Sequence, residues 1–496
     1  MNYALLSVTD KTNLEKIAAH LMSQGLRLIS SGGTASYLKD HGIEVTPVEQ
    51  ITGEAEMFSG RVKTLHPKIH GGLLFDRQNP AHTQQKDTYN IPTISVVVAN
   101  LYDFAGEAVA KNLPLEQAIE HVDIGGPTMI RAAAKNFASV LIVTDPADYD
   151  QVIERTQDQP TGDLDLRLGF AQKAFALTAA YEDMISRYFC ATRGALRYGE
   201  NPQQPAYFKG GPGAYPIDKL HGKELSYNNY LDLDAAVKLA YEFGQSPAAV
   251  IIKHTNPCGC ALGATIEDAY DKALGGDPVS AFGGIVALTR EVSAELATKL
   301  HEMFLECVVA PSFSEEALKL LTQKKNLRLL TLADLAGANA QTDEWRQRSA
   351  LGGTLIQRED PICDDSAWEV QGSAQLGEAT RRDLLFAMKV AKHVKSNALV
   401  FAKDEATVAV GAGQTSRVDS CYAAIAKAER LGADLKGCVL ASDGFFPFRD
   451  SIDMLKPLGL AGVVQPGGSI RDQEVLEAAS EANLPMVFSH KRHFRH

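Results

Sequence analysis

Lys253 and His254 stand side by side at the end of an apolar, β-branched stretch, residues 250–252. A buried strand over that stretch would present both side chains together at its end. Histidine exchanges protons near neutral pH, and a neighbouring ammonium group stabilises negative charge that develops on a reacting atom. The pair therefore suits acid–base catalysis. The alternative is a histidine whose ring nitrogens bond nearby backbone groups.

A zinc site is an alternative for the segment that follows. Zinc deaminases bind their metal through a Pro-Cys-x-x-Cys arm and a His-x-Glu segment upstream of it. Here Pro257 precedes Cys258 and Cys260, in the spacing Cys-x-Cys, and no His-x-Glu comes before them. The ligand count is too low for zinc, so the sequence predicts no metal. Asn256-Pro257 instead indicates a turn after the strand.

A second stretch with chemical potential is Ser-Gly-Gly-Thr at residues 31–34, between a short apolar strand and a helical pattern. That order presents backbone N–H groups and a helix N-terminus to a phosphate. The stretch has neither the Gly-Lys-Ser/Thr ending of a Walker loop nor the G-x-G-x-x-G pattern of dinucleotide sites. Taken alone, a left-handed turn with a helix cap explains it equally well.

Polar residues follow several predicted strands of the first half. The strands are predicted at residues 3–8, 26–29, 94–99 and 140–143, with helical patterns between them, which indicates a parallel sheet covered by helices. Ligands of such sheets bind beyond the carboxyl ends of the strands. Five polar residues fall at these ends or in the loops beyond: Thr9, Ser31, Thr34, Asn100 and Asp123. We expect them to line one pocket, with three candidate cations: Arg61, Lys63 and Lys135.

Three phenylalanines around a proline, residues 445–448, lie between Asp443 and Arg449 in a predicted loop. They could simply belong to the core. Aromatic rings beside charges in a loop are also what a flat heteroaromatic ligand needs for stacking and polar recognition. Both interpretations stay open at this point.

The composition limits the class of protein. A chain of 496 residues, 45% hydrophobic and 22% charged, is typical of a globular protein with two or three domains. A net charge of −12 argues against a general nucleic-acid binder, so a phosphate site must be a local cationic pocket. Seven cysteines without framework spacing, no membrane-length apolar run and no signal-peptide pattern predict a cytoplasmic protein.

A domain boundary is predicted near residue 195, because a helical segment at 146–190 is followed by dense glycine and proline up to 216. The second half restarts the alternation of strands and helices. Its strands are predicted at 250–252, 285–288, 307–310, 398–402, 407–410, 439–441 and 462–464, with a helix at 266–274. Two α/β subdomains are plausible, at about 250–330 and from about 351 to the end.

Together these stretches resemble the AICAR transformylase/IMP cyclohydrolase family, in order and over nearly the whole chain. The matching stretches are SVTDK (7–11), SGGT (31–34), GRVKTLHP (60–67), NLY (100–102), DIGG (123–126), RAAAKN (131–136), LRYGENP (196–202), KHTNP (253–257), DPVSAFG (277–283), GAGQTSR (411–417), SDGFFPFRD (442–450) and RHFRH (492–496).

The resemblance implies an α/β fold: an N-terminal methylglyoxal-synthase-like parallel-sheet domain, then two cytidine-deaminase-like α/β subdomains that lack zinc. Residues 1–195 would form the IMP cyclohydrolase domain, with the methylglyoxal-synthase-like core at about 1–145, and residues 196–496 the AICAR transformylase domain. The implied function is the last two steps of de novo purine synthesis. They are formyl transfer from 10-formyltetrahydrofolate to AICAR and closure of formyl-AICAR to IMP.

For cyclisation the resemblance implies four catalytic residues, with Asp123 as orienting base, Lys135 as proton donor and acceptor, and Lys63 and Tyr102 stabilising the alkoxide. The implied substrate-binding positions of this half are Thr9, Asp10, Lys11, Ser31, Gly32, Gly33, Thr34, Arg61, Val62, Thr64, Asn100, Leu101, Ile124 and Gly125. No metal and no tightly bound cofactor are implied.

For formyl transfer the resemblance implies His254 as general base and Lys253 as the cation for the oxyanion. The implied binding positions are Arg197, Tyr198, Gly283, Glu306, Asn397, Arg417 on the folate side, Phe445, Asp450, Ser469, Ile470 and Arg492; relatives vary between Asp and Glu at position 306. The implied partners are AICAR, formyl-AICAR, IMP, the folate cosubstrate and a second copy in a homodimer, with no nucleic acid and no membrane.

A competing hypothesis is a phosphate-ligand sensor module fused to a nucleotide-modifying, deaminase-like enzyme. A sensor would need the phosphate loop at 31–34. It would not need Lys63, Tyr102, Asp123 and Lys135 together.

Overall fold

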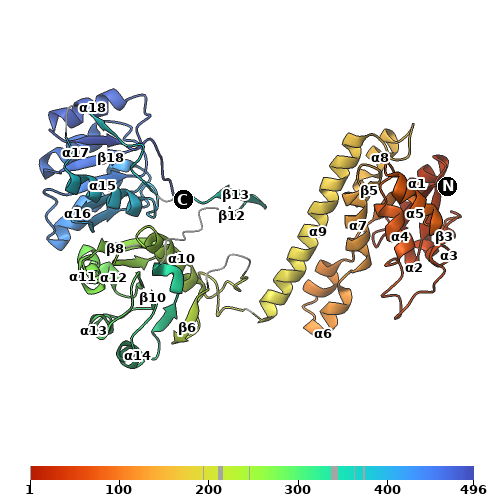
Figure 1. Ribbon diagram of the computed structural model, residues 1–496, viewed down its shortest axis with the longest axis horizontal. Coiled ribbons are helices and arrows are strands. Elements are labelled where there is room, and N and C mark those ends of the chain that lie inside the picture. The colour runs from red at the N-terminus through yellow and green to blue at the C-terminus, as the bar shows by residue number, and fades with distance from the viewer. Residues whose placement is uncertain are drawn as a thin grey trace. The chain divides into compact units, whose positions relative to one another are not determined.

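The computed structural model describes residues 2–193, 195–210, 216–244, 246–336, 345–361, 363–372 and 375–496. The chain divides into two compact units, Met1–Gly194 and Ala195–His496, each with its own sheet (Figure 1). Among the described helices, none combines the length and the apolar character needed to cross a membrane.

The first unit is built on a five-stranded sheet in which all strands are parallel, in the order β3-β2-β1-β4-β5. Its central strand pair is buried on both faces, which explains why the strand predicted at 94–99 is apolar except for Ser95. The predicted parallel sheet is therefore confirmed. The strands are β1 (Asn2–Ser7), β2 (Arg27–Ser30), β3 (Thr46–Pro47), β4 (Thr93–Ala99) and β5 (Leu141–Val143).

Helices cover both faces of this sheet. Residues of α1, α8 and the start of α9 pack on one face, while α3, α4, α7 and the next part of α9 pack on the other. Each helix buries one apolar stripe, as in α1, where Leu14, Ile17 and Leu21 are buried. The helices are α1 (Leu14–Ser23), α2 (Gly32–Asp40), α3 (Val48–Thr52), α4 (Pro67–Leu74), α5 (Pro80–Thr88), α6 (Leu115–Ala118), α7 (Gly125–Lys135), α8 (Tyr149–Arg155) and α9 (Leu164–Arg193).

The second unit contains one mixed sheet of twelve strands, in the order β14-β19-β18-β17-β15-β16-β8-β7-β9-β10-β11-β6. The pairing of β16 with β8 joins its two halves. The strands are β6 (Asp218–His221), β7 (Ala248–Lys253), β8 (Asn256–Leu262), β9 (Ile285–Leu288), β10 (Cys307–Ala310), β11 (Arg328–Thr331), β14 (Glu369–Gln371), β15 (Leu399–Lys403), β16 (Ala406–Gly411), β17 (Val439–Ser442), β18 (Gly462–Gln465) and β19 (Met486–Phe488).

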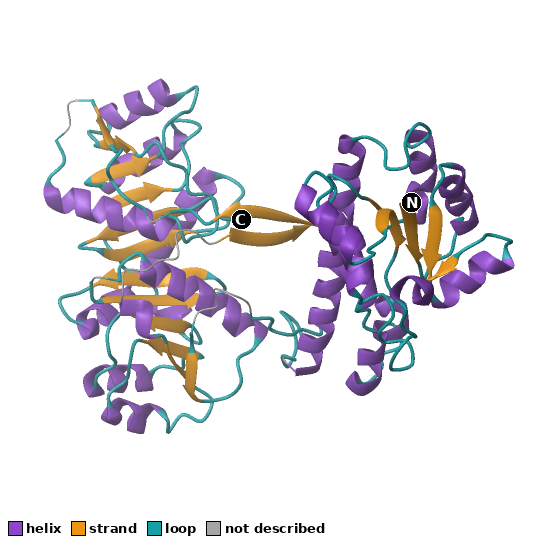
Figure 2. Cartoon of the chain, turned by 45° about the vertical axis from the view of Figure 1, so that its right-hand side comes forward, coloured by secondary structure: helices purple, strands orange, loops and turns teal. Residues whose placement is uncertain are grey.

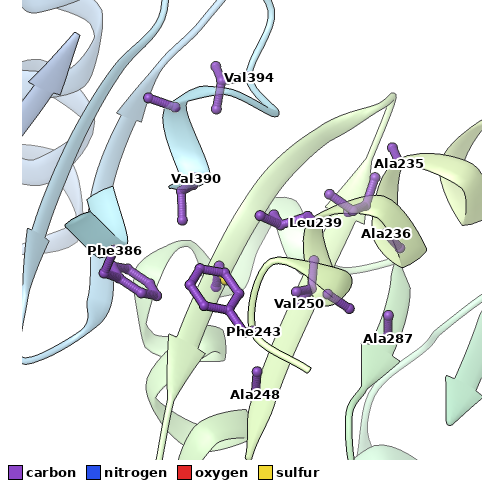
Figure 3. Packing of buried hydrophobic residues seen from close by; sticks show 14 of the residues in the cluster. Ala235, Ala236, Leu239, Phe243, Ala248, Val250, Ala287, Phe386, Val390 and Val394 are labelled. Atoms are coloured by element: carbon purple, nitrogen blue, oxygen red, sulfur yellow. The ribbon is translucent and has the colours of Figure 1, made fainter. Parts of the chain in front are cut away.

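One face of this large sheet is covered by α10 and α15, and the other face by the remaining long helices. Figure 3 shows the first face at close range, where Phe243 lies beside Phe386 with 5.3 Å between the ring centroids. This contact joins the halves of the unit. The helices are α10 (Tyr227–Tyr241), α11 (Ile266–Gly276), α12 (Pro278–Ala281), α13 (Ala294–Glu302), α14 (Glu315–Leu321), α15 (Glu378–Ala391), α16 (Arg417–Leu431), α17 (Asp450–Leu455) and α18 (Asp472–Glu481).

The second unit departs from the sequence prediction at the turn after β7. The turn is His254–Thr255, with φ of 52° and 60°, and β7 continues directly into the antiparallel strand β8. A two-residue turn with both residues at positive φ is the usual hairpin connection. Asn256-Pro257 was expected to turn but begins β8 instead, and Pro257 is tolerated because the register shifts beside it.

A separate two-stranded ribbon, β12 (Trp345–Ala350) and β13 (Gly353–Arg358), belongs to the second unit (Figure 2). Its apolar side chains are exposed: Leu355 by 63%, Ile356 by 58% and Trp345 by 57%. An isolated hairpin is marginally stable at best in water, so an uncovered apolar hairpin is unusual in a monomer.

Candidate active sites

Asn100 connects two loops at the carboxyl edge of the first sheet. Its Oδ1 accepts the backbone N–H groups of Thr9 at 2.6 Å and Asp10 at 3.1 Å, and its Nδ2 donates to the Asp10 carbonyl. Thr34 joins the same edge, since its hydroxyl accepts the Val8 N–H at 3.1 Å and donates to the Val8 carbonyl at 3.0 Å. The structure thus brings the loops after β1, β2 and β4 together.

The loop at residues 60–67 adds a cation to this edge. Gly32, with φ of +53°, begins α2, and a Cβ added there would lie 3.2 Å from Lys63 Nζ. Lys63 also pairs with Glu56 at 2.8 Å. An ammonium group above a helix N-terminus is a suitable environment for a phosphate. On the other side of the loop, Thr64 Oγ1 lies 3.2 Å from the Cβ position of Gly125 at the start of α7.

Asp123 lies just before α7 and is buried, with 8% of its surface exposed. Burial raises the pKa of its carboxyl group, against hydrogen bonds from the backbone N–H groups of Gly126, Tyr102 and Gly125. Its own backbone N–H donates to the Tyr181 hydroxyl at 2.8 Å. A carboxylate with a raised pKa, held by backbone donors beside polar loops, can serve as a general base.

Most of the other predicted residues of this half lie on the same loops. Tyr102 and Ile124 are exposed, Lys11 donates to the Thr9 carbonyl, and Arg61 pairs with Glu120. The remaining predicted residues continue these segments: Asp10, Ser31, Gly33, Val62 and Leu101.

Lys135 is the exception. It is the last residue of α7, whereas Asp123 lies two residues before the first. At about 1.5 Å per residue, the helix places Lys135 about 15 Å from Gly125, near the opposite edge of the sheet. Within one chain the structure therefore does not bring Lys135 to the loops that hold Asp123 and Lys63.

In the second unit, strand directions place the predicted residues at one edge of the large sheet. Lys253 ends β7. Gly283, Glu306 and Asn397 precede β9, β10 and β15. The strand pairing makes these three strands run opposite to β7, so they begin at the edge where β7 ends. The loops after β16, β17 and β18 leave from the same edge. Those loops and the chain end carry Arg417, Phe445, Asp450, Ser469, Ile470 and Arg492.

The β7–β8 hairpin is tied to the loop that carries Asn397. Asn256 Nδ2 donates to the His254 carbonyl at 3.1 Å, and its Oδ1 accepts the Lys395 N–H at 3.0 Å. Lys253 Nζ donates to the Phe282 carbonyl at 2.8 Å, next to Gly283. The His254 side chain is exposed at the tip of the turn. An exposed imidazole beside an ammonium group can take a proton while a neighbouring oxyanion is stabilised.

Arg417, which the resemblance places on the folate side, is buried among protein acceptors. It is 6% exposed and donates to Asp443 at 2.6 Å, to Asn397 Oδ1 at 3.0 Å and to the Phe445 carbonyl at 3.1 Å. A guanidinium group whose donors are used by buried protein acceptors has little left for a ligand. Its observed task is to hold the loops of Asn397 and Phe445 together.

The phenylalanine loop combines both interpretations that its sequence left open. Phe446 is fully buried, whereas Phe445 and Phe448 are 37% and 46% exposed. The C-terminal tail reaches this loop, because a Cβ on Gly444 would lie 2.5 Å from the Phe494 ring. Arg492 is placed over that ring at 4.5 Å.

The remaining predicted residues occupy varied surroundings. Glu306 pairs with Arg328, and Gly283 has φ of +76° and donates its N–H to the Phe304 carbonyl. Asp450 and Ile470 are exposed, Ser469 Oγ accepts the Arg471 N–H, and Arg197 lies over the Tyr198 ring at 5.1 Å.

Comparison with known proteins supplies the family. The model of the "AICARFT/IMPCHase bienzyme" family matches residues 133–427, and the model of the "MGS-like domain" matches residues 13–128. The chain belongs to the AICARFT/IMPCHase bienzyme family. It is accordingly a bifunctional enzyme of purine biosynthesis, a formyltransferase and an IMP cyclohydrolase, and its formyltransferase activity implies a folate cosubstrate.

Proteins named "Bifunctional purine biosynthesis protein PurH" match this bienzyme chain over its length. Those of Persephonella marina and Nostoc punctiforme are each 46% identical over 99% of both chains, and that of Listeria monocytogenes is 44% identical over 100% of both. A solved structure described as "Crystal structure of ForH" is 35% identical, covers 38% of this chain and 98% of its own, and has a TM-score of 0.34. The sensor hypothesis is not favoured by the full-length relatives.

The zinc alternative does not fit the cysteines of this bienzyme. The register shift beside Pro257 turns Cys258 and Cys260 to different packing clusters on the two sides of the sheet. Burial raises the pKa of the Cys258 thiol to about 11 and that of the Cys260 thiol further. The described residues contain no group of three or more His, Cys, Asp or Glu placed for a metal.

A cavity of about 330 Å³ lies beside the start of β7, away from the sheet edge that carries Lys253. Phe243, Phe386 and Lys389 line it together with Leu262, which pairs with the first residue of β7. It is thus separated from Lys253 by the length of the strand.

A buried charge cluster, which sequence reasoning missed, supports the polar edge of the sheet in the second unit. Glu242 Oε1 accepts from Lys392 at 2.5 Å and lies 3.1 Å from His393 Nε2. Arg495 lies 3.2 Å from the other ring nitrogen of His393, and its backbone bonds Ser396, the residue before Asn397. The cluster therefore anchors both the tail and the Asn397 loop. Its members come from three segments far apart in sequence, at Glu242, Lys392–His393 and Arg495, so no local sequence pattern predicts it.

Replacement of this buried carboxylate, Glu242→Gln, should destabilise the second unit by about 3 kcal/mol at neutral pH, since it leaves the Lys392 ammonium buried without its counter-charge. We expect the melting temperature of the second unit to fall by about 5–10 °C, with that of the first unit unchanged. Glu302→Gln, at the exposed end of α13, is the matched control.

The same variant has a defined pH dependence. Burial alone would raise the pKa of Glu242, but the hydrogen bond from His393 and the charges of His393 and Lys392 outweigh it and hold this pKa at about 2. A lowered folded-state pKa gives stability that is complete above the ordinary value of 4.5 and is lost as the pH falls toward about 2. The difference between the wild type and Glu242→Gln should therefore shrink over that range, and a difference independent of pH would contradict this account.

Proposed function

We propose that the two activities are divided between the two units. Met1–Gly194 closes formyl-AICAR to IMP, and Ala195–His496 transfers the formyl group to AICAR. The observation that carries this division is that each unit has its own sheet with its own polar edge, one with Asp123 and Lys63 and the other with Lys253 and His254. The chain supplied with AICAR and 10-formyltetrahydrofolate should release tetrahydrofolate and form IMP.

In formyl transfer, the 5-amino group of AICAR attacks the formyl carbon. That amine is weakly nucleophilic because its lone pair is delocalised into the ring, so it must lose its proton as the new C–N bond forms. His254 accepts this proton, and Lys253 stabilises the oxyanion of the tetrahedral intermediate. The bond from the formyl carbon to N10 of the folate then breaks, and N10 takes up a proton.

Phe445 and Phe448 provide exposed rings for stacking at this edge. Asn397, Gly283, Glu306, Arg197, Tyr198, Asp450, Ser469, Ile470 and Arg492 are proposed to bind the nucleotide or the folate, as the resemblance implies. Arg417 is assigned to holding the loops.

In cyclisation, the carboxamide nitrogen of formyl-AICAR attacks the formyl carbon, and the resulting carbinolamine loses water. Asp123 takes the proton of the attacking nitrogen, and Lys63 with Tyr102 stabilises the alkoxide. The 5′-phosphate lies at the N-terminus of α2, where backbone N–H groups and side chains receive it. The residues proposed to bind substrate here are Thr9, Asp10, Lys11, Ser31, Gly32, Gly33, Thr34, Arg61, Val62, Thr64, Asn100, Leu101, Ile124 and Gly125.

The finer features of the family are also part of this proposal. The second unit corresponds to two deaminase-like subdomains that use no zinc, no cofactor is tightly bound, and the enzyme works in the cytoplasm. It acts as a homodimer whose formyl-transfer site draws on both chains. The exposed apolar ribbon β12–β13 supports association with a second copy, because it needs a covering surface.

A homodimer also offers a place for Lys135, which one chain cannot bring to Asp123. If Lys135 of the second chain supplies the proton, Lys135→Ala and Asp123→Asn will each lose cyclisation, while an equal mixture of the two, unfolded and refolded together, will recover about a quarter of it. Half of the dimers are then mixed, and one of their two sites is intact. An inactive mixture, or full activity of Lys135→Ala alone, would contradict this role.

A further inference from the structure

The turn that presents His254 is conformationally unfavourable. Both His254 and Thr255 adopt positive φ, at 52° and 60°, and neither is glycine; for the β-branched Thr255 this region is a genuine outlier. Such a conformation is strained and persists only where the surroundings enforce it. Something outside the hairpin must therefore hold it.

Asp232 of α10 is the group in contact with this turn. Its Oδ1 accepts the backbone N–H of Thr255 at 2.7 Å, and the N–H of His254 also bonds the carboxylate. Burial raises the pKa of Asp232, and the two backbone bonds together with the charge of His254 oppose that rise. One carboxylate thus receives both N–H groups of the strained residues.

The helix that carries Asp232 is well anchored. A reciprocal pair of hydrogen bonds between Ser226 and Asn229 caps its N-terminus, at 3.0 Å and 3.2 Å. Leu233 and Ala236 beside it are buried in the largest core cluster. Asp232 therefore has a fixed position relative to the core, from which it contacts the tip of the hairpin.

We propose that Asp232 is a positioning residue for formyl transfer: it holds the His254–Thr255 turn so that the imidazole meets the substrate amine. This inference rests on the proposed role of His254. The carboxylate acts through the backbone of the turn, and it contacts neither substrate.

The test uses Asp232→Asn and Asp232→Ala in the full chain. Asn keeps an acceptor oxygen but no charge, and Ala keeps neither, so we expect kcat for formyl transfer to fall by about tenfold and about a hundredfold respectively. KM for AICAR should stay nearly unchanged, because the substrate contacts remain. Asp234→Asn, on the same helix but exposed and paired with Lys238, is the control and should retain wild-type kcat.

The decisive readout is the double variant. If Asp232 acts through His254, adding Asp232→Asn to His254→Ala should change kcat by less than about twofold. A merely structural role would lower kcat of the double variant well below that of His254→Ala. Either that result or a wild-type kcat in Asp232→Asn would overturn the inference. If His254→Ala itself turns over like the wild type, the role of His254 fails instead, so the two failures are distinguishable. Calorimetric AICAR binding verifies that each variant is folded.

Discussion

His254→Ala is expected to lower kcat for formyl transfer by about two to four orders of magnitude, with closure of formyl-AICAR unaffected. The imidazole lies exposed at the tip of the β7–β8 turn, next to Lys253, so it can reach the amine of a bound nucleotide. Without it, the weakly nucleophilic amine must lose its proton to water. The remaining rate comes from substrate positioning and from the Lys253 ammonium group.

The measurement is tetrahydrofolate release from 10-formyltetrahydrofolate and AICAR. His221→Ala serves as the matched control, because His221 lies in β6 at the far end of the twelve-stranded sheet. Near-wild-type turnover of His254→Ala would remove the histidine from the mechanism.

Asp123→Asn should reduce cyclisation by a similar factor, about two to four orders of magnitude, and leave formyl transfer intact. The amide has the size of the carboxyl group but cannot accept the proton of the attacking nitrogen. Because burial raises the pKa of Asp123 above its ordinary 3.8, the carboxylate needed as base is lost on acidification at a higher pH than for an exposed aspartate. The wild-type rate should therefore fall with decreasing pH along a limb that begins above 3.8.

IMP formation from formyl-AICAR alone measures this step. Asp165→Asn, exposed in the first turn of α9, is the control. Unchanged cyclisation in Asp123→Asn would mean that the base is another group.

The sequence was most informative where local pattern and chain direction determine position. Alternating strands and helices in the first half specify a parallel sheet, and a parallel sheet sends every strand end to one edge. The contact of Asn100 with Thr9 follows from that rule, although the residues are 91 positions apart. The apolar runs of β9 and β10 likewise coincide with strands predicted at the same residues.

Sequence reasoning was least informative where contacts between distant segments determine the local structure. Asn256-Pro257 has the composition of a turn, yet β8 begins there because both residues pair with the end of β7. Arg417 is a cation at the end of a polar stretch and so resembles a ligand-binding residue, yet it pairs with the buried carboxylate of Asp443. Asp232 carries no local signal at all, since its importance arises only when α10 packs against the hairpin turn.

One time course tests the central claim that two separate sites act in succession. The wild type, His254→Ala and Asp123→Asn each receive AICAR and 10-formyltetrahydrofolate, while tetrahydrofolate and IMP are followed together. We predict that the wild type forms both, that His254→Ala forms neither but still closes added formyl-AICAR, and that Asp123→Asn releases tetrahydrofolate while formyl-AICAR accumulates without IMP. Loss of both activities in either folded variant would contradict the account.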